Sequence, residues 1–215
     1  MTFLIVIIGW IFSLCLHEFS HSLVAYLGGD TSVREKGYLT FNPLKYTHPV
    51  YSILLPMLFL IMGGIGLPGG AVYIETWRLR SRGWQSAVSL AGPAANLLLA
   101  FLLGAVFALV PHTNTGIWPG VAFLALMQVS ALVLNLIPLP PFDGYGALVP
   151  YLPIHVRNSI NQVGTMIMVV VFLVLWEVSV VNAGFWGLVF RISQNLGIPL
   201  DLAVIGLRGF QFWQH

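Results

Sequence analysis

The stretch LCLHEFSHSLVAYLGG, residues 14–29, closes the first apolar run of the chain and holds two histidines and a glutamate within five residues. The run begins near residue 3 and is long enough to cross a bilayer as a helix. Titratable side chains at membrane depth are unfavourable, and they usually face a protein interior or a water-filled cavity. We therefore expect His17, Glu18 and His21 to face the interior of a membrane protein and to bind a ligand there.

The composition of the whole chain supports a membrane location. Of its 215 residues, 58% are hydrophobic and only 7% are charged, and the mean hydropathy is +0.88. A soluble domain carries about a quarter charged residues, so the lipid bilayer is the expected surrounding of most of this chain. The nine basic residues are scattered along the sequence, so no nucleic-acid partner is expected.

The hydropathy pattern predicts an all-α polytopic membrane protein that forms a single domain, residues 1–215. The apolar segments are followed by a mixed tail at 184–213, and they cover residues 3–28, 49–66, 84–110, 117–137 and 160–182. We expect about four full transmembrane helices and a re-entrant segment at 49–74 with a short strand-like piece. The tail is expected to form a C-terminal helix that lies at the membrane interface or crosses it.

The distribution of basic residues predicts the orientation of these segments. The connection 111–117 has no lysine or arginine, whereas the stretches on both sides of 49–74 carry Arg34, Lys36, Lys45, Arg78, Arg80 and Arg82. Because basic loops stay on the cytoplasmic side, both stretches should lie there. Segment 49–74 must then enter and leave by the same face, which its prolines and glycines favour. An ordinary span at 49–66 is the alternative.

The spacing within HEFSH points to a metal site. His17 and His21 are four residues apart and lie on one face of a helix, where two imidazoles can share a zinc ion. Glu18 has the position of the general base in an H-E-x-x-H motif. A hydrolytic zinc usually has three protein ligands, and the strongest third candidate is Asp143, in a proline-rich turn where Gly144 allows a tight bend. Weaker candidates are Glu75, Glu177, His48 and His155.

Three motifs together resemble a known family. HEFSH at 17–21, LAGPAANLLLA at 90–100 and NLIPLPPFDG at 135–144 are similar to the site-2 protease family of intramembrane zinc metalloproteases, in its compact bacterial form without PDZ or CBS domains. The resemblance covers roughly residues 10–150, with Phe142 where the family usually has leucine. It implies one zinc ion per chain, bound by His17, His21 and Asp143, with Glu18 activating water. It also implies that Asn135 and Asn96 lie near the site.

The expected function is therefore intramembrane zinc-dependent hydrolysis of peptide bonds in transmembrane or membrane-proximal segments of other membrane proteins. The expected location is the bacterial inner membrane, with the site toward the cytoplasm. Asn135 is a candidate oxyanion donor, although both asparagines could instead bond neighbouring helices. GGAVYI at 69–74 could bind an unwound substrate by strand addition, or it could be an ordinary turn.

Two other functions fit parts of the sequence. A catalytically silent scaffold could keep the fold and the metal, but it would have no need of Glu18. A metal transporter could use the histidines as a transit site, but such transporters often have internal repeats and several acidic residues along the path, and neither is evident here.

Overall fold

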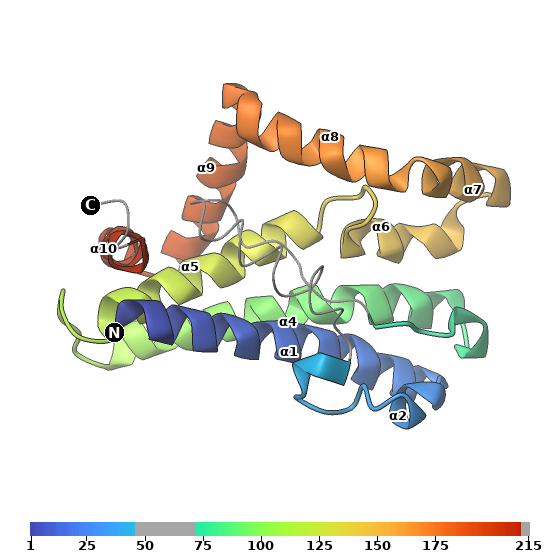
Figure 1. Ribbon diagram of the computed structural model, residues 1–215, viewed down its shortest axis with the longest axis horizontal. Helices are drawn as coiled ribbons and strands as arrows, with labels where there is room; N and C mark the ends of the chain where they lie inside the picture. The colour runs from blue at the N-terminus through green and yellow to red at the C-terminus, as the bar shows by residue number, and fades with distance from the viewer. Residues whose placement is uncertain (46–71, 212–215) are drawn as a thin grey trace.

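Three long helices form the centre of the molecule. The computed structural model describes residues 1–45 and 72–211. Within these ranges α1 (Thr2–Gly28), α4 (Arg82–Leu109) and α5 (Trp118–Asn135) run beside one another along the long axis (Figure 1), and each is long and apolar enough to cross a membrane. The described part of the chain contains helices and no strand. The predicted all-α membrane fold is confirmed.

Local signals set the ends of these helices. Gly29 ends α1 in the left-handed region, with φ of 118°, a conformation that glycine adopts without strain. The Ser81 hydroxyl accepts a hydrogen bond from the Trp84 N–H and caps the start of α4. Pro119 lies in the first turn of α5, where its missing N–H leaves no helical bond unmade.

The end of α1 meets the start of α4. The Arg80 N–H donates to the Gly28 carbonyl at 3.0 Å, and the Glu75 N–H donates to Asp30 Oδ2 at 2.7 Å. The stretches that precede and follow residues 46–71 therefore lie at the same end of the bundle, as the topology argument requires of them. The re-entrant path predicted for 49–74 falls outside the described residues up to residue 71, and Val72–Ile74 belong to neither helix nor strand.

Three short helical pieces lie near this end of the bundle. Two precede residue 46 in the sequence, and the third precedes α4. They are α2 (Ser32–Glu35), η1 (Pro43–Lys45) and η3 (Thr76–Arg78). Helix α5 runs back antiparallel to α4, so its C-terminal end points toward this end of the bundle (Figure 1). The chain segments that carry the three sequence motifs thus come to one region of the bundle.

The C-terminal third is more broken than its hydropathy indicates. It comprises α6 (Asp143–Leu148), η4 (Val149–Tyr151), α7 (Ile154–Gln162), α8 (Gly164–Glu177), α9 (Ser179–Asn195) and α10 (Leu200–Phe210). Instead of one straight span at 160–182, α7 and α8 meet at 64°, and Val178 takes an extended conformation between α8 and α9. The Asn182 side chain donates to the Leu175 carbonyl, which compensates for helical bonds lost at this break.

The predicted C-terminal helix is present as a bent pair. Helices α9 and α10 make an angle of 120°, and the pair is apolar enough for a broken span or a re-entrant loop. Helix α10 packs on α5, where a Cβ on Gly206 would collide with the Pro119 carbonyl. Glycine at this position allows the two backbones to approach closely, as is common between membrane helices. Helix α5 lies at the centre of the core, with most of its side chains buried.

Candidate metal centre

Helix α1 turns its titratable side chains toward α4 and α5. His17, Glu18 and His21 are only 7%, 4% and 6% exposed, whereas Leu4 and Ile8 on the outer face are 61% and 66% exposed. An apolar helix therefore carries its polar groups on the side away from lipid, as their unfavourable transfer into hydrocarbon requires.

Asp143 lies against both histidines. Its Oδ2 is 3.2 Å from His17 Nε2, and its Oδ1 is 3.4 Å from His21 Nε2. The two Nε2 atoms are 3.0 Å apart. Within the described ranges these three residues form the one group of at least three histidine, cysteine or acidic side chains with all ligand atoms within 4.8 Å of one another. The structure thus brings together the three ligands that the sequence predicts.

The turn after α5 carries Asp143 to this position. Phe142 is 2% exposed and packs edge-to-face on Phe172, with ring centroids 6.0 Å apart. A Cβ on Gly144 would lie 2.7 Å from the Ile137 carbonyl oxygen and would collide with the Leu136 carbonyl. Gly144 has no positive φ, so glycine is needed here because it allows close approach to the end of α5.

The other ring nitrogen of each histidine is held by an oxygen. His17 Nδ1 is 2.5 Å from Asn96 Oδ1, and His21 Nδ1 is 2.6 Å from the Val88 carbonyl. These oxygens can only accept a hydrogen bond, so each Nδ1 carries the proton and donates it. In the neutral imidazole each Nε2 is then left with a lone pair, and each lies close to the other Nε2 and to Asp143. Metal-binding histidines typically donate their second N–H to a carbonyl or carboxylate in this way.

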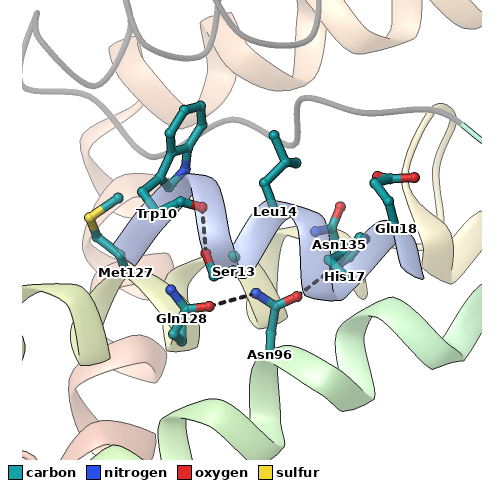
Figure 2. Close-up of a pocket in the computed structure, with 10 residues that line it drawn as sticks. Trp10, Ser13, Leu14, His17, Glu18, Asn96, Met127, Gln128 and Asn135 are labelled. Carbon is teal, nitrogen blue, oxygen red and sulfur yellow. Dashed lines mark hydrogen bonds between the residues drawn. The ribbon is translucent and has the colours of Figure 1, made fainter. Parts of the chain in front are cut away.

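The orientation of Asn96 is fixed by a chain of hydrogen bonds that runs into α5. Gln128 Nε2 donates to the Leu124 carbonyl. Gln128 Oε1 accepts from Asn96 Nδ2 at 2.9 Å, and Asn96 Oδ1 is left for His17 (Figure 2). Only one direction of donation satisfies every hydrogen bond of this series, because the Leu124 carbonyl cannot donate. Sequence reasoning placed Asn96 near the site but did not identify Gln128 as its partner.

Gly92 lies directly behind the two imidazoles. A Cβ at this position would collide with His17 Nε2 and His21 Nε2. Gly92 belongs to the LAGPAANLLLA motif, and the structure shows that it makes room for the rings. One signal could have identified it: in an α-helix, Gly92 lies four residues before Asn96 and four after Val88, so all three share one face.

The donor set fits a zinc ion. In their neutral form the two imidazoles direct their Nε2 lone pairs to the point where the Asp143 carboxylate also lies, and Asp143 Oδ2 is buried without a hydrogen-bond partner in the described part of the chain. Nitrogen and carboxylate oxygen are ordinary zinc ligands, and three of them leave a fourth position open. A cation bound between the two Nε2 atoms and the Asp143 carboxylate would remove the repulsion among their lone pairs.

Glu18 and Asn135 lie beside the three ligands. Both residues line a cavity of about 320 Å³ together with His17, His21 and Asp143. They also line a smaller cavity between α1 and α5, shown in Figure 2. Cys15 is buried and does not line the larger cavity.

The weaker ligand candidates are not part of this group. Glu75 binds Lys36 Nζ and Arg78 Nε at 2.9 and 2.5 Å, and these hydrogen bonds lower the pKa of its carboxyl. Glu177 and His155 are exposed on α8 and α7, and His48 lies outside the described residues.

Comparison with known proteins identifies the family to which this chain belongs. Over 215 residues the chain is 46% identical to "Putative zinc metalloprotease Rip2" of Mycolicibacterium smegmatis, and the alignment covers 98% of this chain and 81% of that protein. The Rip2 protein of Mycobacterium tuberculosis H37Rv is 44% identical over 212 residues, with the same coverage. This chain belongs to the site-2 protease family.

A more distant relative agrees with this assignment. "Putative zinc metalloprotease YwhC" of Bacillus subtilis is 30% identical to this site-2 protease over 200 residues, which cover 83% of this chain and 86% of that protein. No family model and no solved structure matches the chain. The chain is thus a zinc metalloprotease and an integral membrane protein, and its cofactor is Zn²⁺.

Proposed function

We propose that this chain is one membrane-embedded protease domain that hydrolyses peptide bonds within transmembrane or membrane-proximal segments of other membrane proteins. His17, His21 and Asp143 hold one zinc ion. The observation that carries the proposal is the convergence of these three ligands inside an apolar helical bundle, on a cavity that Glu18 and Asn135 also line.

In the proposed mechanism, the bound zinc ion supplies Lewis acidity, which makes water a nucleophile near neutral pH and polarises the scissile carbonyl. Glu18 accepts the proton of the attacking water and delivers it to the leaving amine. Its position supports this role, because the carboxyl lines the cavity next to the ligands without being one of them. Burial among α1, α4 and α5 limits the access of bulk water to the reacting groups.

Asn135 donates a hydrogen bond to the oxyanion that develops on the substrate. Its side chain is 4% exposed and makes no hydrogen bond to another described residue. Asn96 differs, because both ends of its amide are already bonded, to His17 and to Gln128. The free amide supports the catalytic role for Asn135, whereas Asn96 positions the His17 ring.

The site opens toward the cytoplasm of a bacterial inner membrane in this proposal. The six basic residues in the stretches that flank residues 46–71 lie around the end of the bundle that holds the metal centre, and the connection at 111–117 has none. Arg208 on α10 lies elsewhere, beside Gly209, which approaches Thr2 at the start of α1. Membrane proteins retain such basic loops in the cytoplasm. Val72 and Ile74 line the same cavity as the ligands, which supports a substrate lying along this segment.

Cleavage of a transmembrane helix in a purified system tests this function. We expect the zinc-loaded chain in liposomes to cleave a single-span peptide with Gly and Pro at mid-span and to spare a matched polyleucine span. The scissile amides must be freed from the helix, and Gly and Pro lower helix stability by about 1 and 3 kcal/mol. Removal of zinc with a chelator should abolish cleavage, and added zinc should restore it.

The same preparation separates the alternatives. A chain that binds zinc but cleaves neither the transmembrane peptides nor an unfolded soluble peptide would be a scaffold. Zinc entering the liposome lumen, measured with a trapped indicator dye, would favour a transporter. Either result would contradict the proposed protease function.

A further inference from the structure

A groove runs from the metal centre to the first turn of α4. The cavity of about 320 Å³ at the ligands shares Val72, Ile74, Val88 and Ser89 with a second cavity of about 320 Å³. The second cavity shares Gln85, Val149, Pro150 and Arg157 with a third, of about 410 Å³, which Arg82 also lines. The three cavities are therefore contiguous and lead away from the site toward the basic end of the bundle.

The walls of the groove are fixed by contacts among its elements. Gln85, Val88 and Ser89 lie on one face of α4 at helical spacing. The Ser86 hydroxyl donates to the Ala147 carbonyl at 2.7 Å and ties α4 to α6, next to Val149 and Pro150. On the other side, Lys36 Nζ donates to the Tyr73 carbonyl at 3.2 Å and holds the segment that begins at Val72.

The far end of the groove has two arginines that pair with no acidic side chain of the described residues. Glu75 is already engaged by Lys36 and Arg78, and no carboxylate of the described residues pairs with Arg82 or Arg157. Arg78 and Arg80 lie over the rings of Trp77 and Trp84 outside the groove. The groove thus ends in uncompensated positive charge, which fits an acidic group of a bound peptide.

The length of the groove predicts how many residues separate that acidic group from the scissile bond. Gly92 lies at the level of the two Nε2 atoms, and Arg82 precedes it by ten residues, or about 15 Å along the axis of a helix. An extended peptide advances about 3.3 Å per residue, so it covers this distance in four or five residues.

We propose that Arg82 and Arg157 bind an acidic side chain of the substrate, four or five residues from the scissile bond on its cytoplasmic side. The inference rests on the proposed function, because it assumes that the peptide reaches the metal centre through this groove. It identifies the preferred substrates as transmembrane segments followed by Asp or Glu at this spacing. A substrate lysine at this position would be repelled by the two arginines.

Peptide binding and cleavage in neutral liposomes test this preference. The probe is the Gly/Pro transmembrane peptide with Glu, Gln or Lys placed in turn at each of the first eight positions on the cytoplasmic side of the cleaved bond. Binding is measured by energy transfer to the Glu18→Gln chain, and cleavage is measured with the wild type. We expect Glu at the fourth or fifth position to bind about fivefold tighter than Gln, as for a partly solvated ion pair.

Variants locate the effect. The double variant Arg82→Gln/Arg157→Gln should lose the preference for Glu. The matched control Arg191→Gln/Arg208→Gln removes the same charge from exposed positions on α9 and α10. This control should keep the preference for Glu. A variant effect that occurs only with phosphatidylglycerol in the liposomes, without any peptide preference, would assign the arginines to lipid headgroups and overturn the proposal.

The outcomes also separate this inference from the function on which it rests. Cleavage that does not depend on the charge at any position would overturn the acidic preference and leave the protease function intact. Failure to bind or cleave any of the peptides would overturn both.

Discussion

The Glu18→Gln variant is expected to bind zinc as tightly as the wild type and to lose about 10²- to 10⁴-fold of its peptide cleavage rate, the usual contribution of a general acid–base group. Glutamine keeps the shape of the buried side chain but cannot accept a proton from water. Zinc binding should persist because the ligand atoms belong to His17, His21 and Asp143. Zinc content by metal analysis and cleavage by peptide mass are measured on the same sample.

An exposed glutamate on another helix provides the control. Glu177 lies at the exposed end of α8, and Glu177→Gln should leave both zinc content and cleavage rate unchanged. If Glu18→Gln kept more than a tenth of the wild-type rate with full zinc occupancy, another group would have to be the base.

The Asp143→Ala variant is expected to lose more than 100-fold in zinc affinity. Loss of a supporting residue outside the ligand shell costs about 10- to 100-fold, and removal of a ligand should cost more. The remaining His17 and His21 provide two nitrogens, one ligand fewer than a hydrolytic zinc site usually has. Affinity is measured by competition with a chelator of known strength, at a pH where both histidines are neutral in the unfolded chain.

Folding is followed separately in this experiment. Helical content by circular dichroism and the thermal unfolding midpoint without zinc show whether the bundle survives the substitution. Asp201→Ala, at an exposed position in the first turn of α10, is the matched control and should bind zinc normally. A zinc affinity of Asp143→Ala within threefold of the wild type would exclude Asp143 as a ligand.

The sequence predicts those parts of the site where polar or titratable side chains lie in or beside an apolar segment. His17, Glu18 and His21 stand out because an apolar helix gains nothing from them without a ligand. Asp143 stands out because it is one of only seven acidic residues and lies in the proline-rich turn that follows an apolar segment. The structure places both flanks of residues 46–71 at one end of the bundle, through the contact of Arg80 with Gly28.

Other parts have only a weak signal in the sequence, or none. Gly92 is one of 22 glycines, and only the packing of α4 on α1 shows that a Cβ there would meet two imidazoles. Gln128 interrupts an apolar helix without a motif around it, and its role depends on a neighbour 32 residues away. The break at Val178 has no proline or glycine within four residues, so local sequence favours a continuous helix there and packing decides otherwise.

X-ray absorption at the zinc edge, recorded on the full chain loaded with one equivalent of zinc, tests the central claim most directly. We predict nitrogen and oxygen neighbours at about 2.0–2.2 Å, with the outer-shell pattern of two imidazoles and no sulfur at about 2.3 Å. The imidazole signal should disappear in His17→Ala/His21→Ala. A sulfur neighbour from Cys15, or a zinc spectrum unchanged in that double variant, would contradict the proposed centre.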